Sequence, residues 1–151
     1  MDIETGVVSI LRYVGVEDCG KIINRTIVDG QIQGGVAQGI GSALFEELVY
    51  DDQSQLLTAS LMDYLVPGAG EIPQIEIEHL ETLSPLTPSG SKGVGESGTI
   101  ASSAAICNAV SDALSPFGIT FTKLPITPPD VLAALDRTHV TAETSPRRQE
   151  A

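Results

Sequence analysis

The stretch of residues 88–98, PSGSKGVGESG, constrains this chain more than any other part of its sequence. Four glycines surround one lysine, Lys92, and one glutamate, Glu96, and an apolar, alanine-rich segment follows directly. Glycine allows unusual backbone angles and lets the main chain approach a ligand closely. Because this backbone would hold the carboxylate in place, Glu96 is predicted to be either a fixed structural charge or a positioned base.

The same glycines match the spacing G-x-G-x-x-G over residues 93–98. A dinucleotide fingerprint must follow a strand inside a βαβ unit, whereas residues 84–92 carry two prolines and several hydroxyl groups. The phosphate-loop pattern also fails, because Lys92 precedes its glycines. What remains is the N-terminus of a helix beginning near Ser97 or Thr99, an end that attracts anions.

Both charged residues of the stretch keep a simple structural interpretation. Glu96 suits the N-terminus of a helix, where an acidic side chain is favoured, and the local sequence favours this reading. Lys92 is either a solvated charge or the partner of an anionic ligand. The stretch by itself does not decide between the structural and the functional readings.

Composition excludes several kinds of partner. The 151 residues are 42% hydrophobic and 19% charged, as in a globular domain. A net charge of −12 argues against nucleic acid and against an anionic membrane surface as partners. Two cysteines predict no disulfide framework, and no signal peptide or membrane-spanning run is expected. A cytoplasmic protein without membrane insertion is the simplest expectation.

Patterning along the chain predicts a mixed α+β fold. Strands are expected over residues 7–14, 75–82 and 119–124. Helices are expected over residues 24–48, 99–114 and 130–135. Residues 56–65 fit either a strand or a helix, and the polar residues 138–151 are predicted to form a disordered tail.

The helix expected over residues 24–48 has an unusual polar face. Because positions seven apart nearly coincide on a helix, Asn24, Gln31 and Gln38 share that face. Gly34 and Gly35 lie between the two glutamines. The opposite, apolar face is formed by Val36, Ile40, Ala43 and Leu44. Amide side chains around bare backbone suit a polar ligand with many donors and acceptors.

Five glycines fall within this expected helix, at positions 30, 34, 35, 39 and 41. Each glycine costs a helix about 1 kcal/mol relative to alanine. Their number implies that something packs very close to the helix. Packing of another helix against small residues and contact with a ligand both remain open as explanations.

The other polar candidates are weak when considered alone. A lone cysteine such as Cys19 is more often buried in a core than placed at a ligand. Neither His79 nor His139 has a second histidine at metal-binding spacing. The sequence therefore predicts no metal site made of protein ligands.

Several motifs in order resemble the C-terminal part of the large, molybdenum-binding subunit of the xanthine oxidase family. The similarity is to the aerobic carbon monoxide dehydrogenase, quinoline and isoquinoline oxidoreductase and aldehyde oxidoreductase members, and it covers residues 4–135. The motifs are RYV at 12–14, DCG at 18–20, IN at 23–24, GGVAQGIG at 34–41, EE at 46–47, MDYLVP at 62–67, ET at 81–82, SP at 84–85 and KGVGESGTI at 92–100. The resemblance implies a C-terminal segment of an α+β molybdenum-binding domain with a long glycine-rich helix, spanning residues 1–137.

The same resemblance implies a molybdopterin cofactor, usually in the cytosine dinucleotide form, whose dithiolene holds the molybdenum. Glu96 matches the active-site glutamate, a base beside the metal, and Gln38 matches the glutamine that approaches the oxo ligand of the metal. The loop that carries the base and touches the pterin is matched by Lys92, Gly93, Val94 and Gly95. The dinucleotide pocket is matched by Asp18, Cys19, Asn24 and Gln31, and the helix face with Gly34 and Gly35 is consistent with such a cofactor.

The implied activity is that of a molybdenum hydroxylase, an oxidoreductase that oxidises an aldehyde, an N-heterocycle or carbon monoxide with oxygen derived from water. Electrons would pass to iron–sulfur clusters and FAD on partner subunits or domains. Because the family subunit is several times longer, the chain is expected to be a fragment that needs the upstream part of the large subunit. The alternatives are an inactive remnant, a non-catalytic module that binds molybdopterin cytosine dinucleotide, and a nucleotide-binding domain that uses the glycine loop.

Overall fold

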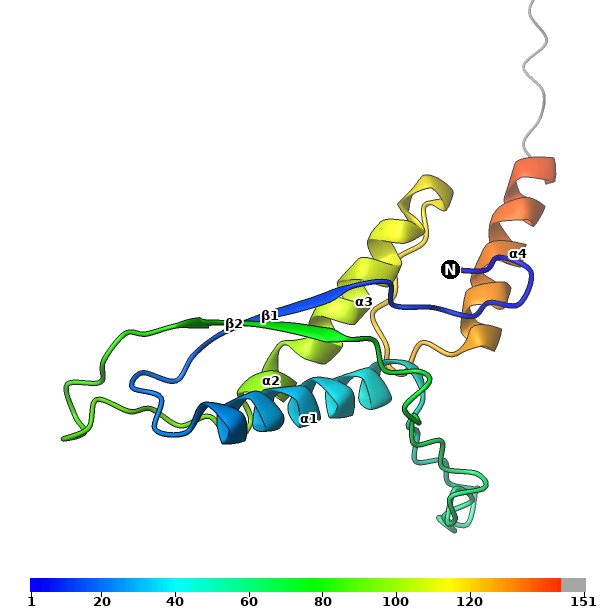
Figure 1. Ribbon diagram of the computed structural model, residues 1–151. Helices are drawn as coiled ribbons and strands as arrows, with labels where there is room; N and C mark the ends of the chain where they lie inside the picture. Colours follow the sequence, from blue (N-terminus) through cyan, green and yellow to red (C-terminus); the bar gives the residue numbers. More distant parts are fainter. Residues whose placement is uncertain (145–151) are drawn as a thin grey trace, which may run out of the picture.

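The structure, a computed structural model, describes residues 1–144, with side chains described as far as Thr138. It combines helices with one small sheet, which confirms the predicted α+β class (Figure 1). In chain order the elements are β1 (Tyr13–Asp18), α1 (Arg25–Leu44), β2 (Ile75–Leu80), α2 (Ser97–Ile100), α3 (Ser102–Ala113), the 3-10 turn η1 (Ser115–Phe117) and α4 (Pro128–Thr144). Among the described residues, no helix is both long and apolar enough to cross a membrane.

Strands β1 and β2 pair in parallel, with Tyr13 opposite Ile75 and Asp18 opposite Leu80. The sheet lies alongside α1, and Ile75 and Ile77 pack against the core that α1 helps to form (Figure 1). The strand expected over residues 75–82 is confirmed as far as Leu80.

Two other strand predictions were wrong, for the same physical reason. The first strand lies at Tyr13–Asp18 rather than at 7–14, because β2 begins only at the residue opposite Tyr13. Residues 119–124 form no strand, because their backbone bonds to α3 instead of to a neighbouring strand. The Phe121 amide donates to Ser111 Oγ at 3.0 Å, and the Cys107 thiol donates to the Phe121 carbonyl at 3.4 Å. Apolar, β-branched sequence makes a chain extended, but only a partner makes it a strand.

Helix α1 begins after Asn24, whose Oδ1 accepts a hydrogen bond from the amide of Ile27 at 3.2 Å. An asparagine in this position satisfies a backbone donor that the helix itself cannot. The helix ends at Leu44, four residues before the predicted end. Burial of its apolar face confirms the helical pattern, since Val36, Ile40, Ala43 and Leu44 are all in the core.

The helix expected over residues 99–114 is broken into α2 and α3 at Ala101. The Ser102 hydroxyl donates to the Gly98 carbonyl at 2.5 Å. A side-chain hydroxyl thus takes the carbonyl that the Ser102 amide would use in a continuous helix. Ser102 Oγ is also 2.8 Å from the Tyr13 hydroxyl, so the break is tied to β1.

Helix α4 differs from the short helix and the tail that the sequence predicted. It begins at Pro128, two residues before the expected start, and continues to Thr144, beyond residue 138 where the tail was expected to begin. Proline is well tolerated in a first helical turn, and the buried residues Val131, Ala134 and Leu135 follow helical spacing. Residues 145–151 lie outside the described part of the chain.

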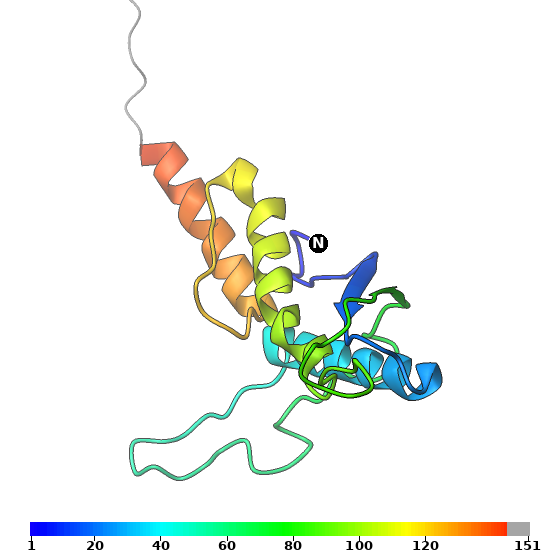
Figure 2. The same cartoon turned by 90° about the vertical axis from the view of Figure 1, so that its left-hand side faces the viewer.

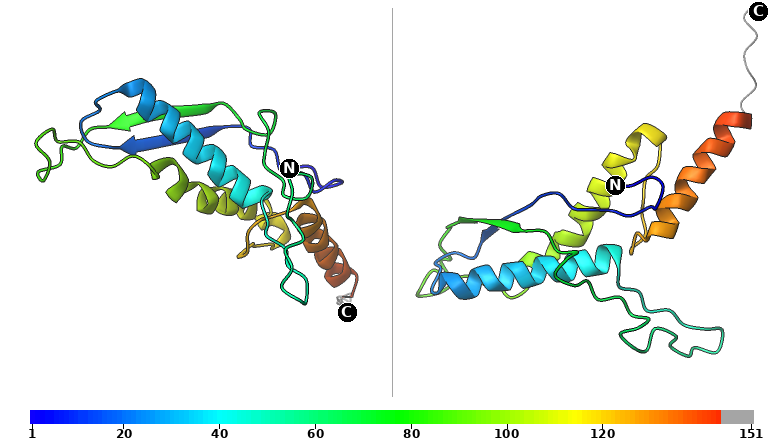
Figure 3. Two further views of the ribbon diagram at one scale, coloured as in Figure 1. Left: turned by 90° about the horizontal axis from the view of Figure 1, so that it is seen from below. Right: turned by 45° about the vertical axis from the view of Figure 1, so that its right-hand side comes forward.

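Residues 45–74 connect α1 to β2 without a helix or a strand. Figures 2 and 3 show this connection as an arm that projects away from the helices. The segment 56–65, predicted as strand or helix, is neither and carries only an isolated bridge between Leu56 and Tyr50. The arm is fastened at its base, where the Tyr64 hydroxyl donates to Glu46 Oε2 at 2.5 Å.

Candidate functional site

A polar hollow of about 380 Å³ lies between α1 and the glycine stretch that leads into α2. Its lining consists of Gly30, Gln31, Gly34, Gly35, Gln38, Gly95, Glu96, Thr99 and Ile100. Residues far apart in the sequence therefore meet here, because α1 packs along α2 and α3 (Figure 1). Six of the residues singled out from the sequence come together in this one place: Gln31, Gly34, Gly35, Gln38, Gly95 and Glu96.

Helix α1 is fixed against α2 and α3 by hydrogen bonds that repeat every four residues. The Thr99 hydroxyl donates to the Gly35 carbonyl at 3.1 Å, and the Ser103 hydroxyl donates to the Gly39 carbonyl at 3.2 Å. Gln31 adds a third bond in the same series, since its Nε2 donates to the Gly95 carbonyl at 2.6 Å. In all three pairs the partners are 64 residues apart, and we call this series the ladder.

The glycines of α1 divide into two groups. A Cβ at Gly39 would lie 2.2 Å from the Ser102 Cβ, and a Cβ at Gly35 would lie 3.0 Å from the Gly98 backbone. Close packing of helices therefore explains these two, whereas a Cβ at Gly41 would lie 2.1 Å from Oε1 of Glu46, in the connection that follows α1.

Gly30 and Gly34 form the second group. A Cβ built at either position would have no atom within 4 Å, and both residues line the polar hollow. Packing within the described chain gives no reason for glycine at these positions. A Cβ built at Gly95, on the facing loop, would likewise have no atom within 4 Å.

Glu96 directly precedes α2, yet its side chain makes no capping hydrogen bond. Among the described residues the carboxylate has no hydrogen-bond partner and no ion pair. Glu96 thus lies at the helix N-terminus that the local sequence predicted, but its carboxylate does not accept the backbone hydrogen bond that a capping side chain would. The Gln38 amide, on the other wall of the hollow, is also without a partner among the described residues.

A second cluster joins the end of β1 to the glycine stretch. Lys92 Nζ lies 3.1 Å from Asp18 Oδ2, and the Lys92 amide donates to the Cys19 carbonyl at 2.7 Å. Asp18 Oδ1 accepts from the amides of Gly20 at 2.9 Å and Thr82 at 3.1 Å. These hydrogen bonds, that of Gly20 foremost, hold the pKa of Asp18 well below its usual value. The ammonium group of Lys92 is therefore paired with the carboxylate of Asp18, and it is neither a freely solvated charge nor an unpaired cation available to an anionic ligand.

The remaining residues predicted from the sequence do not line the polar hollow. They are Asp18, Cys19, Asn24, Lys92, Gly93 and Val94. Cys19 is 4% exposed and belongs to the core, as a lone cysteine often does. Asn24 caps α1. Val94 is half-buried against the core.

Sequence reasoning missed three residues of the hollow as site residues, namely Gly30, Thr99 and Ile100. Thr99 is a member of the ladder, and Ile100 leaves 77% of its surface exposed at the rim. The four-residue spacing that links Thr99 to Ser103 was visible in the sequence. Nothing in the sequence indicated which helix these hydroxyls would meet.

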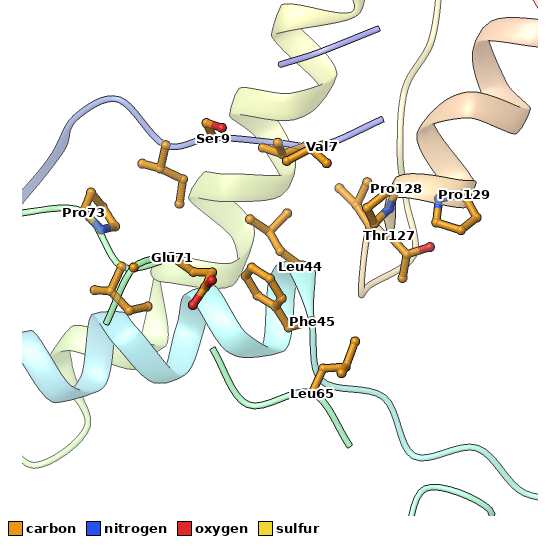
Figure 4. Close-up of a pocket in the computed structure, with 15 residues that line it drawn as sticks. Val7, Ser9, Leu44, Phe45, Leu65, Glu71, Pro73, Thr127, Pro128 and Pro129 are labelled. Atoms are coloured by element: carbon orange, nitrogen blue, oxygen red, sulfur yellow. The ribbon is translucent and has the colours of Figure 1, made fainter. Parts of the chain in front are cut away.

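A larger hollow of about 680 Å³ lies at the other end of α1. Figure 4 shows aliphatic side chains, Phe45 and three prolines around it, with Glu71 as the one acidic residue among those labelled. Glu71 Oε2 already accepts a hydrogen bond from the Gly68 amide at 2.7 Å. The apolar hollow thus offers volume, but no polar groups arranged for chemistry.

Comparison with known proteins identifies the family of this chain. Residues 1–73 match the family described as the molybdopterin cofactor-binding domain. The chain is 54% identical to the nicotine 6-hydroxylase large subunit of Paenarthrobacter nicotinovorans over 134 residues, which are 89% of this chain and 16% of that protein. The chain belongs to the family of molybdopterin-binding large subunits. This confirms the resemblance read from the motifs.

Solved structures of this large-subunit family share the fold. Quinoline 2-oxidoreductase from Pseudomonas putida 86 matches with a TM-score of 0.80 at 50% identity, over 82% of this chain and 16% of that one. The Cu,Mo-CO dehydrogenase matches with a TM-score of 0.88 at 34% identity, over 93% of this chain and 18% of that one. The chain thus spans about one sixth of the length of these large subunits.

The residues of the polar hollow fit a molybdopterin. Its pterin and phosphate groups need donors and acceptors at short range, and the walls offer the Gln38 amide beside bare backbone at Gly34 and Gly95. Within the described residues, no three His, Cys, Asp or Glu side chains are grouped so that they could hold a metal ion. The hollow therefore offers polar groups and one carboxylate, that of Glu96.

Proposed function

We propose that this chain supplies the base-bearing part of a molybdenum hydroxylase site, an oxidoreductase that needs the rest of the large subunit. One observation carries the proposal. The carboxylate of Glu96 and the amide of Gln38, both without a partner among the described residues, line one hollow whose backbone is bare at Gly34. Similarity to several molybdenum enzymes supports it.

In this proposal Gln38, Gly34 and Gly95 contact the cofactor, and Glu96 acts as the general base. When bound, molybdenum in molybdopterin would supply two-electron oxidation of the substrate and would activate the oxygen, derived from water, that is transferred. Glu96 accepts the proton that this oxygen must lose. A carboxylate without a competing hydrogen bond is suited to that task, and a fixed loop keeps it within reach.

Several finer assignments are also proposals. The loop residues Lys92, Gly93 and Val94 approach the pterin through their backbone, and Asp18, Cys19 and Asn24 border the dinucleotide part of the cofactor, in its cytosine form. Electrons pass to an iron–sulfur subunit and to an FAD-containing subunit in the cytoplasm. The names of the relatives, nicotine 6-hydroxylase and quinoline 2-oxidoreductase, favour an N-heterocycle over an aldehyde or carbon monoxide as substrate.

Glu96→Gln in the complete enzyme that contains this chain tests the proposal. Turnover should fall by about 10³-fold, in the range that a general base contributes, while the molybdenum content stays near that of the wild type. Glu78→Gln is the matched control, because Glu78 is exposed on β2 and remote from the hollow. Retained turnover in the Glu96 variant would refute the assignment of the base. A wild-type enzyme that holds molybdenum but oxidises no substrate would favour the non-catalytic module instead.

A further inference from the structure

We propose that Gln31 is a positioning residue for Glu96, which it holds in place through the carbonyl of Gly95. This inference rests on the proposed function, because it concerns where the base is placed. It gives Gln31 a different role from the dinucleotide contact that the resemblance implies. One N–H of the Gln31 Nε2 already donates to the Gly95 carbonyl, at 2.6 Å.

The loop between Lys92 and Glu96 meets α1 through the Gly95 carbonyl. Neither Gly93 nor Gly95 has a protein atom within 4 Å of the place where a Cβ would be. Val94 is half-buried against the core. The turn over residues 94–97 is closed by Ser97, whose hydroxyl and amide donate to the Val94 carbonyl at 3.1 and 3.4 Å. The Gln31 amide ties this turn to α1, through the carbonyl of the residue immediately before Glu96.

The ladder explains why Gln31 can hold this carbonyl. The pairs 31–95, 35–99 and 39–103 advance by four residues on both segments, which is about one helical turn. Two pairs join helix to helix, and the third extends the same register beyond the start of α2 into the loop. The position of the loop is therefore set by the packing of α1, which is tight at Gly35 and Gly39.

The other end of the loop is held independently. The Lys92 amide donates to the Cys19 carbonyl at 2.7 Å, and Gly20 forms an antiparallel bridge with Ser91. The base-bearing loop is thus tied to β1 at one end and to α1 at the other. Loss of the α1 tie should free the Gly95–Glu96 peptide while leaving the β1 tie intact.

Two substitutions at Gln31 and two at Gln33 test this role. Gln31→Leu removes the amide, and Gln31→Glu keeps its shape but removes the donor. Gln33→Leu and Gln33→Glu are matched controls, because Gln33 is exposed on α1, lies outside the hollow and has no hydrogen-bond partner among the described residues.

The first measurement is hydrogen–deuterium exchange of the 151-residue chain. A peptide covering residues 93–100 should exchange faster in both Gln31 variants than in the wild type and in both Gln33 variants. Exchange of peptides from α3 reports global unfolding. If Gln31→Leu unfolds the chain, the exchange of the loop peptide in Gln31→Glu is the test. Unchanged exchange of the loop in the Gln31→Glu variant would overturn the proposal.

The second measurement is turnover of the complete enzyme. The Gln31 variants should lose about tenfold in kcat with KM and molybdenum content near the wild-type values, since small displacements of a catalytic group are costly. Faster loop exchange with unchanged kcat would refute the positioning role. A normal kcat in Glu96→Gln would refute the proposed function but not the exchange result, so the two failures can be told apart.

Discussion

Two pairs of glycines on α1 differ in what surrounds them. Gly39 faces Ser102 of α3 at a distance that admits no Cβ, and Gly35 faces the backbone of α2 at a distance that leaves a Cβ very little room, whereas Gly30 and Gly34 face an open hollow. The first pair is explained by the fold of the described chain. The second pair costs helix stability without any packing gain within that chain, which points to something that this structure does not hold. Glycine at one spacing along one helix thus serves two different purposes.

The largest expected effect is at the packed pair. Gly39→Ala would put a Cβ 2.2 Å from that of Ser102, so α1 and α3 would have to move apart. We expect a loss of about 2–3 kcal/mol in the free energy of unfolding, in the range for overpacked cores. Chemical denaturation of the chain measures it. Unchanged stability would show that the ladder does not require this close approach.

An effect of the opposite sign is expected at the open pair. Gly34→Ala should raise the free energy of unfolding by up to about 1 kcal/mol, because alanine is the better helix former and meets no atom here. In the complete enzyme the same change should lower the molybdopterin content, measured after extraction of the cofactor. A variant that is more stable and still fully loaded would remove the reason to connect this glycine with a ligand.

The smallest effect concerns the tie between β1 and the loop. The pKa of Asp18 is lowered in the folded chain, so its contribution to stability is present above the unfolded pKa near 3.8 and is lost as the pH falls below it. Asp18→Asn should therefore weaken the dependence of the free energy of unfolding on pH between about pH 5 and pH 2, the range in which carboxylates titrate. Denaturation curves across that range, compared with Asp52→Asn on the exposed arm, test it.

Sequence periodicity was enough to place the two faces of α1, because helical burial repeats with the turn of the helix. The glycine stretch could also be recognised as the approach to a helix, whereas the role of Glu96 as a base stays a prediction. The sequence could not separate Gly34 from its neighbour Gly35, since both lie near the same face and only the position of α2 distinguishes them. It likewise gave no sign that Asp18 would pair with Lys92, 74 positions away.

The strands show where local patterns fail. Residues 7–12 are as apolar as a buried strand, yet they have no neighbouring strand and remain extended against other parts of the chain. A strand is a property of two segments, whereas the helical face is a property of one. For the same reason the break at Ala101 depends on Ser102 finding both Gly98 and Tyr13, which no local propensity reports.

The constant spacing of the ladder limits how the chain can change length. Residues 45–74 lie in the sequence between the two segments that the ladder joins, residues 31–39 and 95–103, but contribute none of its hydrogen bonds. Insertions in the arm would therefore leave the three pairs in register. A single residue inserted between Gly35 and Gly39 would instead turn one end of α1 by about 100° relative to the other. Gln31 and the packed glycine at position 39 could then no longer face α2 and α3 together. We expect length variation among related chains to collect in the arm, and α1 to keep its length.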